Sequence, residues 1–373
     1  MRIIVLGGAG DVGSRAVQEL AREPGVSAIT IADRRQEEAE RLARDLSTGA
    51  HPVQARAFDA NDHEATVAVM RGHEVVASAL GPFFRYEARM VAAALDAGVD
   101  YTSVCDEWDA TESVFAMCSA TARERGRIVL SGLGTSPGIS NVGVRFLAED
   151  LDRVRRAEIS VFQPLTAGGG EAVIRHLLHI MTGDTLVWRA GEAKTVRALG
   201  ECRVVAFPSF GRVKVWNMGH AEPATIPRFL PDIEEVSFFM GFGRGASLLV
   251  HAAKLGLFQS QRFVDWLVSR LLRLENRMGL AGRATRGAVR VDVWGERHGE
   301  PVHRLACGVG LMREATGVSL AVGALMLARK QVTVAGGGVY APEACLDARI
   351  FMQAMKDKGI VAFRDLGMTR VAL

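Results

Sequence analysis

A glycine-rich turn near the N-terminus is the feature that most constrains the fold. Ile3–Leu6 is a short apolar run typical of a buried strand, and it leads directly into Gly8-Ala9-Gly10-Asp11-Val12-Gly13. A second apolar run, Ile29–Ala32, ends in Asp33 about twenty residues after the turn. A glycine triplet alone would be weak evidence, because ordinary strand-to-helix turns also use glycine. The order of strand, G-x-G-x-x-G turn, helix, strand and acid is, however, the pattern of a dinucleotide-binding βαβ unit.

Each glycine of the turn has an expected physical role. Gly8 allows a tight turn, Gly10 lets the backbone approach a pyrophosphate, and Gly13 lets the helix pack closely on its strand. The helix that starts near Asp11 and Val12 offers unpaired N–H groups and a positive dipole end to the phosphates. These five residues are therefore predicted to bind the cofactor.

The residues after the second strand bear on the choice of cofactor. Asp33 is expected to accept hydrogen bonds from the adenosine ribose and to repel a 2′-phosphate, which favours NAD. Arg34 and Arg35 leave NADP open, because a guanidinium here can neutralise a 2′-phosphate or stack on adenine. Both arginines could also be a solvated helix start. FAD is disfavoured, because no second flavin-type glycine motif is present.

Strands and helices alternate through the first third of the chain. Strand-type runs occupy residues 53–58, 74–80, 100–104 and 127–131, and helix-type runs occupy residues 34–46, 64–71, 86–97 and 113–125. This alternation predicts an α/β domain, a doubly wound parallel sheet of the Rossmann type. We place this domain at residues 1–134.

Ligands in such sheets bind at the carboxyl ends of the strands, so residues there are candidates for the site. Asp59 ends the third strand, and Leu80-Gly81-Pro82-Phe83 ends the fourth. This loop is predicted to cover the nicotinamide ribose and pyrophosphate, although a strand-ending turn would need the same Gly-Pro pair. Asp106 follows the fifth strand and is expected near the nicotinamide, with a helix N-cap as the structural alternative.

The pattern changes after about Ser136. Strand-like runs at residues 157–162, 203–206, 213–217, 236–240 and 288–296 have few crossover helices between them. They predict a second, α+β substrate domain with a mixed or antiparallel sheet, which we place at residues 135–305. Gly168-Gly169-Gly170 is expected to be a flexible loop ahead of a helix at residues 171–181.

Composition narrows the class of protein. The 373 residues carry a formal net charge of +3, too small by itself to indicate a nucleic-acid partner. Five scattered cysteines without C-x-x-C spacing argue against a disulfide framework and a structural zinc. The longest nearly apolar stretch, Ala315–Ala328, is too short to span a bilayer and suits a buried helix. A cytoplasmic enzyme without a transmembrane segment is expected.

One region stands apart in charge. Residues 244–304 hold eleven Arg and Lys against five Asp and Glu. Within it, one helical stripe is apolar and consists of Phe263, Leu267, Leu271, Leu274 and Met278. A solvated basic face over a packed or dimerising stripe is the favoured interpretation, and a homodimer is expected. The alternative is a helix that lies on a membrane or a polyanion.

Several segments together resemble the saccharopine dehydrogenase-like family. They are Ala79-Leu80-Gly81-Pro82-Phe83, Ala97-Gly98-Val99-Asp100-Tyr101, Cys105-Asp106-Glu107-Trp108-Asp109-Ala110-Thr111, Gly134-Thr135-Ser136-Pro137-Gly138-Ile139-Ser140-Asn141, Gly219-His220-Ala221-Glu222-Pro223 with Ile226-Pro227-Arg228, and Ala341-Pro342-Glu343-Ala344-Cys345-Leu346-Asp347. The resemblance covers nearly the whole chain and is strongest over residues 1–145. It implies a C-terminal segment, residues 306–373, that returns to the Rossmann domain. It also implies hydride transfer between NAD(P) and the carbon of a C–N bond in an amino acid or opine-like secondary amine.

Such chemistry needs a base for the ammonium proton and a cation for a substrate carboxylate. His220, Glu222 and Arg228 share a proline-stiffened loop, so His220 or Glu222 is expected near the substrate and Arg228 as a carboxylate anchor. His176 is a further acid or base candidate, besides Asp106. A zinc pair of His176 with His179 is disfavoured, because no matching ligand set stands out. The rival class is a non-catalytic or regulatory dinucleotide-binding protein.

Overall fold

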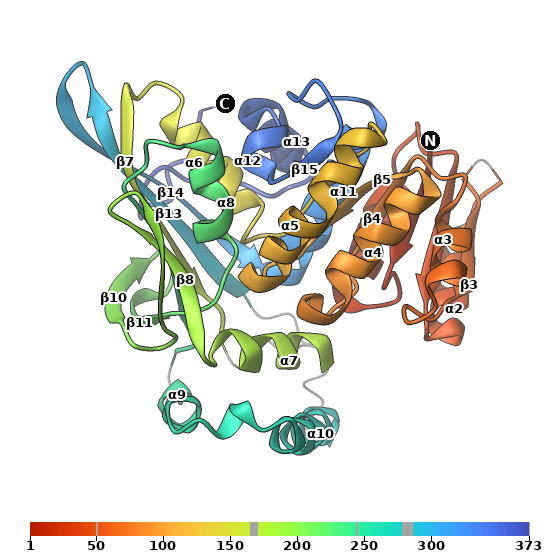
Figure 1. Cartoon of the computed structure of the whole chain (residues 1–373), viewed down its shortest axis with the longest axis horizontal. Coiled ribbons are helices and arrows are strands. Elements are labelled where there is room, and N and C mark those ends of the chain that lie inside the picture. The colour runs from red at the N-terminus through yellow and green to blue at the C-terminus, as the bar shows by residue number, and fades with distance from the viewer. Residues whose placement is uncertain (50, 165–170, 244, 278–285, 373) are drawn as a thin grey trace. The chain divides into compact units, whose positions relative to one another are not determined.

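The computed structural model describes the chain except for residues 50, 165–170, 244, 278–285 and 373 (Figure 1). The expected Gly168–Gly170 loop lies outside the described residues. The chain divides into two compact units, each built from two segments. The first unit comprises residues 1–138 and 313–358, and the second comprises residues 139–312 and 359–373.

The first unit contains the predicted doubly wound parallel sheet. Its seven strands lie in the order β15-β6-β5-β4-β1-β2-β3, and every neighbouring pair is parallel. The strands are β1 (Arg2–Leu6), β2 (Ala28–Asp33), β3 (Val53–Ala57), β4 (Val75–Ser78), β5 (Asp100–Ser103), β6 (Ile128–Leu130) and β15 (Gly338–Tyr340). The chain order reverses on either side of β1, which is where a parallel α/β sheet binds its ligand.

Helices cover both faces of this sheet. They are α1 (Asp11–Leu20), α2 (Gln36–Leu46), α3 (His63–Met70), α4 (Phe83–Ala97), α5 (Trp108–Glu124), α11 (Met312–Ala328), α12 (Pro342–Cys345) and α13 (Ala348–Asp357). Residues of α3, α4 and α5 share one buried apolar cluster with Val129 of β6. The sequence explains where two of these helices begin or end. Asp62 caps the start of α3 by accepting a hydrogen bond from the Ala65 N–H, and α4 ends at Gly98, whose φ is +72°.

The apolar run near the C-terminus forms α11, which is buried as predicted. Two glycines of α11 permit close contact with neighbouring segments: Gly323 faces Leu133, just after β6, and Gly317 faces α1. A methyl group on Gly323 would lie 1.7 Å from Cδ2 of Leu133, and one on Gly317 would lie 2.7 Å from Cβ of Arg15. Within the part of the chain that the structure describes, no helix is both long enough and apolar enough to cross a membrane.

The second unit contains the predicted mixed sheet. Its main strands lie in the order β10-β11-β12-β7-β13-β14; β7 and β12 are parallel, and the other neighbours along this path are antiparallel. The strands are β7 (Arg153–Phe162), β8 (Asp184–Arg189), β9 (Glu192–Arg197), β10 (Cys202–Phe207), β11 (Gly211–Asn217), β12 (Glu235–Gly241), β13 (Arg286–Arg297) and β14 (Glu300–Leu311). The β8–β9 hairpin extends the sheet from β12 and was not predicted.

The two faces of this sheet differ because side chains alternate along each strand. Along β7, Ala157, Ile159 and Val161 enter the main core of the unit. The helices of this unit are α6 (Ile139–Ala148), α7 (Glu171–Ile180), α8 (Glu222–Phe229), α9 (Ala246–Lys254), η2 (Leu257–Gln259) and α10 (Gln261–Arg277). Helices α6 and α8 pack against β13 and β12.

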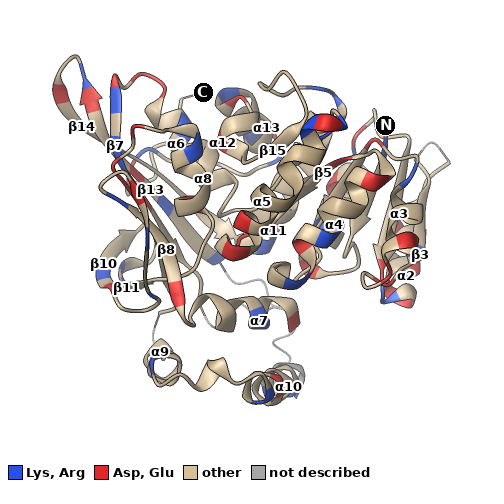
Figure 2. Ribbon diagram, in the orientation of Figure 1, with Lys and Arg blue, Asp and Glu red and all other residues tan. Residues whose placement is uncertain are grey.

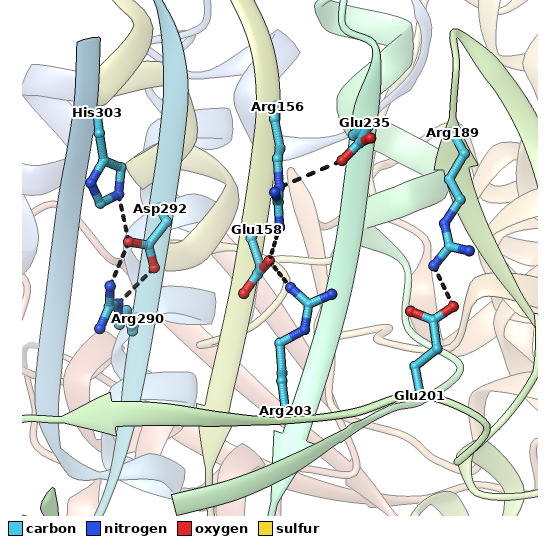
Figure 3. A network of polar contacts seen from close by, with 9 residues as sticks. All are labelled: Arg156, Glu158, Arg189, Glu201, Arg203, Glu235, Arg290, Asp292 and His303. Atoms are coloured by element: carbon cyan, nitrogen blue, oxygen red, sulfur yellow. Dashed lines mark hydrogen bonds and ion pairs between the residues drawn. The ribbon is translucent and has the colours of Figure 1, made fainter. Parts of the chain in front are cut away.

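Side chains that alternate with these core residues point to the other face of the sheet, where charged residues form a layer of ion pairs (Figure 3). Glu158 accepts a hydrogen bond from Arg156 at 2.6 Å and a shorter one from Arg203. Asp292 binds Arg290 and, at 2.8 Å, His303. Both carboxylates are buried, and each has two cationic or imidazole partners, which offsets the cost of removing its charge from water.

The C-terminal boundaries differ from the expected ones. Residues 306–312 remain in the second unit, because β14 pairs with β13 along its whole length to Leu311. Residues 313–358 join the first unit, and residues 359–373 return to the second, where Phe363 forms a bridge with Cys307. The predicted returning segment, residues 306–373, is therefore divided between the two units.

Candidate functional site

The glycine turn has the geometry that a dinucleotide requires. A methyl group on Gly13 would lie 2.2 Å from the Gly7 carbonyl oxygen, so α1 can approach the turn only with glycine there. Gly10 caps α1, brings no side chain to the helix start, and donates its N–H to the Gly7 carbonyl at 2.9 Å. Asp11 and Val12 form the first turn of α1, which presents its N–H groups and dipole to an anion. These residues fit a bound pyrophosphate.

One assignment within the turn is corrected. Gly7, with φ of +68°, adopts the left-handed conformation in the tight turn, which we expected Gly8 to allow. Gly8 is needed instead for packing, because an added Cβ would lie 3.0 Å from both Ile31 Cγ2 and the Val5 carbonyl oxygen. The sequence has two adjacent glycines, Gly7 and Gly8, and either of them could have adopted the turn conformation.

The acid at the end of β2 already has partners. Oδ2 of Asp33 accepts a hydrogen bond from the Ala9 N–H at 3.0 Å, and Oδ1 accepts one from the Arg35 N–H at 3.0 Å. The side chain of Asp33 is buried, whereas that of Arg35 is 46% exposed and extends to within reach of Gly10. Asp33 thus joins the β2 end to the glycine turn, and a cationic side chain lies beside that junction.

The other predicted cofactor residues lie in loops at the same strand ends. Asp59 is exposed and accepts two hydrogen bonds from Asn61, the backbone one at 2.9 Å; this bonding lowers the pKa of its carboxyl. Leu80, Gly81 and Pro82 connect β4 to α4, and Phe83 is buried at the start of that helix. Glu107, in the loop after β5, accepts a hydrogen bond from the Phe84 N–H and so ties two of these loops together.

A buried carboxyl lies beneath these loops. Glu87 of α4 is fully buried and accepts hydrogen bonds from Tyr101 at 3.0 Å, from Ser131 at 3.3 Å and from Ser103. Burial raises the pKa of Glu87 to about 7, although the three hydroxyl groups favour the ionised form. Glu87 could not be singled out from the sequence, because its partners come from β5 and from the residue after β6.

The raised pKa predicts a specific pH dependence of stability. The folded protein holds a proton on Glu87 that the unfolded chain releases above the ordinary carboxyl pKa of 4.5. The stabilisation from this proton is therefore complete below about pH 4.5 and disappears as the pH rises through about 7, a change of about 3 kcal/mol. Glu87→Gln should flatten this dependence in urea unfolding measured from pH 5 to pH 8. The exposed Glu64→Gln is the control, and parallel curves for wild type and Glu87→Gln would contradict the prediction.

In the second unit, the sequence-predicted pair His220 and Glu222 is brought together. Nδ1 of His220 lies 2.5 Å from Oε2 of Glu222, and both side chains are buried. The second oxygen of Glu222 accepts a hydrogen bond from Ser140 Oγ at 3.1 Å. The imidazole stacks on Phe238 with ring centroids 3.8 Å apart. Glu222 thereby holds a proton on Nδ1 and leaves Nε2 as the basic nitrogen.

Local sequence explains this arrangement. Pro223 lies in the first turn of α8, so the helix starts at Glu222 and His220 lies in the preceding loop. Asn141, next to Ser140 on α6, donates to Thr225 of α8 at 3.0 Å and fixes the two helices together. From the sequence, Ser140 and Asn141 were only part of the segments that resemble the family, and no role was predicted for them.

The remaining candidates are distributed as follows. His176 of α7 has its ring 6.2 Å from that of His220, so these two imidazoles are neighbours. Arg228, near the end of α8, is exposed, and its guanidinium donates to the Ala224 carbonyl of the preceding turn. Asp106 belongs to the first unit, between β5 and α5, and is partly buried.

The chain is similar to known proteins in sequence and in structure. Residues 3–126 match the saccharopine dehydrogenase NADP-binding domain. The chain is 24% identical over 266 residues to carboxynorspermidine synthase of Vibrio cholerae, covering 63% of this chain and 62% of that protein. Among solved structures, saccharopine dehydrogenase (L-Glu forming) of Saccharomyces cerevisiae has the same fold, with a TM-score of 0.68, 15% identity and coverage of 100% of both chains.

The parallel sheet, the glycine turn and the domain match define a dinucleotide-binding protein of the oxidoreductase type. Residues 3–126 match the NADP-binding domain of saccharopine dehydrogenases, and the whole chain has the fold of a saccharopine dehydrogenase, so the chain is similar to the saccharopine dehydrogenase-like family. The chain spans 62% of the length of its curated relative, so the reaction that it catalyses is a separate question.

Proposed function

We propose that this protein is an NAD(P)-dependent oxidoreductase that transfers a hydride at the C–N bond of an amino acid or opine-like secondary amine. The observation that carries the proposal is the buried His220–Glu222 pair, which gives the second unit an oriented base. The similarity to carboxynorspermidine synthase supports a substrate with a C–N bond. The dinucleotide supplies the hydride acceptor or donor when it is bound.

The protein's own residues have a defined task in this reaction. In the oxidative direction the substrate carbon loses a hydride, and the nitrogen must lose a proton to form the neutral or protonated imine. His220 is proposed to take that proton at Nε2 while Glu222 stabilises the resulting imidazolium through Nδ1. Once the imidazolium has released this proton to solvent, the same imidazole can accept a proton from a water molecule that adds to the imine, which is then hydrolysed to a carbonyl compound and an amine. His176, Asp106 and Arg228 are proposed to contribute to proton transfer or to carboxylate binding.

A substrate screen tests the reaction class. The protein should oxidise at least one secondary amine or amino acid with NADP⁺ or NAD⁺, or reduce a mixture of a carbonyl compound and an amine with the reduced cofactor. Absorbance at the nicotinamide band measures turnover. Stoichiometric cofactor binding without turnover across amino acids, polyamines and their carbonyl partners would instead support a regulatory dinucleotide-binding protein.

For the cofactor, we propose NADP(H), which reverses the preference for NAD that Asp33 alone suggested. Both oxygens of Asp33 are engaged by backbone N–H groups, and the exposed Arg35 lies beside the glycine turn. Arg34 and Arg35 together can neutralise a 2′-phosphate. The matched family domain is itself an NADP-binding domain, which supports the same choice.

The two arginines should decide cofactor preference. Arg34→Ala with Arg35→Ala should weaken NADPH binding by about ten- to a hundredfold, because charge-assisted hydrogen bonds to the phosphate are lost. NADH binding should change by less than about threefold, since it has no 2′-phosphate. Calorimetric titration of wild type and variant with both cofactors measures this. If wild type binds NADH more tightly than NADPH, or if Asp33→Ala abolishes NADH binding alone, the preference is for NAD.

A further inference from the structure

The segment from α9 to α10 has two separate apolar faces. The inner face packs into the core of the second unit through Val250, Ala253, Phe258, Val264 and Val268. Further residues, among them Phe263 and Leu267, pack against the same cluster. Helix α10 also contacts α7, beside which the segment lies in Figure 1. These buried side chains already attach the segment to the second unit, so its remaining apolar side chains are not needed for that attachment.

A second set of large apolar side chains on the same segment faces solvent. It comprises Leu248 (83% exposed), Leu255 (79%), Leu257 (43%), Trp266 (53%) and Leu274 (52%). Leu248 and Leu255, the C-cap of α9, are seven residues and about two helical turns apart, and Trp266 and Leu274 of α10 are eight residues apart, so each pair lies on the same side of its helix. Of the stripe predicted to be packed or dimerising, Leu274 is therefore exposed in the single chain, and Met278 lies outside the described residues. Such clustering of exposed apolar side chains marks an interaction surface.

The charge of the protein is concentrated in this segment. Residues 246–277 contain Lys254 and four arginines against two acids, a formal charge of 5 − 2 = +3. Because the whole chain also has a formal charge of +3, the other residues sum to zero. Figure 2 shows the arginines on α10. One of the two acids, Asp265, is bound to Arg175 of α7 at 2.7 Å, so it faces the body of the unit.

Cations and apolar side chains alternate on the outer surface of α10. Arg270 lies over the ring of Trp266 at 5.8 Å, and Arg273 and Arg277 follow at successive turns beside Leu274. Arginines flanking an exposed tryptophan and leucines form the surface that inserts into a lipid headgroup layer, with the rings and leucines below the phosphates. Membrane-surface binding of this kind needs no spanning helix.

We infer that the outer surface of α9, η2 and α10 is a docking site for an anionic lipid bilayer. A second copy of the chain is a poorer partner, because a twofold contact would place the same cations against each other. A nucleic acid would satisfy the arginines but would leave Leu248 and Leu255, the most exposed leucines, without apolar contacts. An anionic bilayer satisfies both the charges and the leucines.

Co-flotation of the full-length protein with vesicles tests this inference. Binding is expected to vesicles of phosphatidylcholine with 30% phosphatidylglycerol, with little binding to phosphatidylcholine alone, and it should weaken as salt rises from about 0.1 M to 0.5 M. Arg270→Ala with Arg273→Ala should lower the partition coefficient by about thirtyfold. Leu248→Ser and Leu255→Ser should each lower it by about tenfold. Trp266 fluorescence should shift to the blue on binding, as measured by comparison with Trp266→Phe.

Matched controls come from the first unit. Met117→Ser removes another strongly exposed apolar side chain (71% exposed), and Arg41→Glu reverses an exposed charge; neither should change vesicle binding. Thermal stabilisation by NADPH, if unchanged in every variant, shows that the variants fold. The inference is overturned if wild type does not bind anionic vesicles at low salt, or if the controls weaken binding equally. It is also overturned if wild type is a dimer that Leu248→Ser dissociates, or if polyanion binding alone is found and survives the leucine substitutions.

Discussion

His220→Ala should lower kcat by about a hundredfold to ten-thousandfold while the dissociation constant of the dinucleotide stays within about twofold of wild type. The imidazole is the base that Glu222 orients, and its removal leaves only water to accept the substrate proton. The glycine turn that holds the cofactor belongs to the other unit and keeps its structure. Steady-state kinetics and cofactor titration of the same preparations separate the two quantities.

A second substitution tests the orienting role of Glu222. Glu222→Gln removes the negative charge beside Nδ1, so the imidazolium loses a stabilising partner and the acidic limb of the pH–rate profile of the oxidative reaction should shift to lower pH. We expect a loss of kcat of about tenfold to a hundredfold, smaller than that of His220→Ala. His63→Ala, which removes an exposed histidine of the first unit, should leave both the rate and the profile unchanged. Full activity of His220→Ala would falsify the assignment of the base.

Gly13→Ala should destabilise the first unit and weaken dinucleotide binding together. The new methyl group would lie 2.2 Å from the Gly7 carbonyl oxygen and 2.8 Å from Gly8 Cα, so α1 must move away from the turn. The fixed backbone at this contact makes the cost large, about 3 kcal/mol of unfolding free energy. The displaced helix start should raise the dissociation constant of the dinucleotide more than about tenfold, equivalent to about 1.4 kcal/mol.

The matched control is Gly336→Ala, also in the first unit. Nothing lies within 4 Å of the position that its Cβ would occupy, so stability and cofactor affinity should not fall. Urea unfolding followed by circular dichroism, with cofactor titration by calorimetry, measures both effects. If Gly13→Ala has normal cofactor affinity and normal stability, α1 can move away from the turn without harm. The close contact at Gly13 would then not be needed for cofactor binding.

The first unit was largely predictable because its information is local. Strands β1, β2, β4 and β6 contain short apolar runs, and helices between the strands have their own start and stop signals, such as Asp62 and Gly98. The doubly wound and mixed sheets are both confirmed. The edge strand β15 could not be found in this way, because its three residues pair with β6 about 210 positions earlier in the chain and carry no periodic signal of their own.

In the candidate site, too, contacts between residues close in sequence were predictable and contacts between distant residues were not. His220 and Glu222 are two residues apart, so their pairing was accessible to sequence reasoning. Ser140 contacts Glu222 across 82 positions, and the partners of Glu87 come from β5 and the end of β6. The cofactor acid shows a further limit: Asp33 was correctly placed at the end of β2, but its bond to the Ala9 N–H depends on the folded turn. Geometry that depends on tertiary contacts is not encoded in spacing.

The first unit contains two segments separated by 174 residues, since residues 139–312 belong to the second unit. As the chain leaves the ribosome, residues 1–138 emerge long before β15, α11 and α13 exist. Until then the face of the nascent sheet that α11 later covers is open, and the outer edge of β6 has no neighbour. Such surfaces favour aggregation, so we expect residues 1–138 to need chaperones during synthesis. For the same reason, a fragment that ends at Gly138 is a poor way to isolate the cofactor domain, whereas a fusion of residues 1–138 to residues 313–358 retains every strand of its sheet.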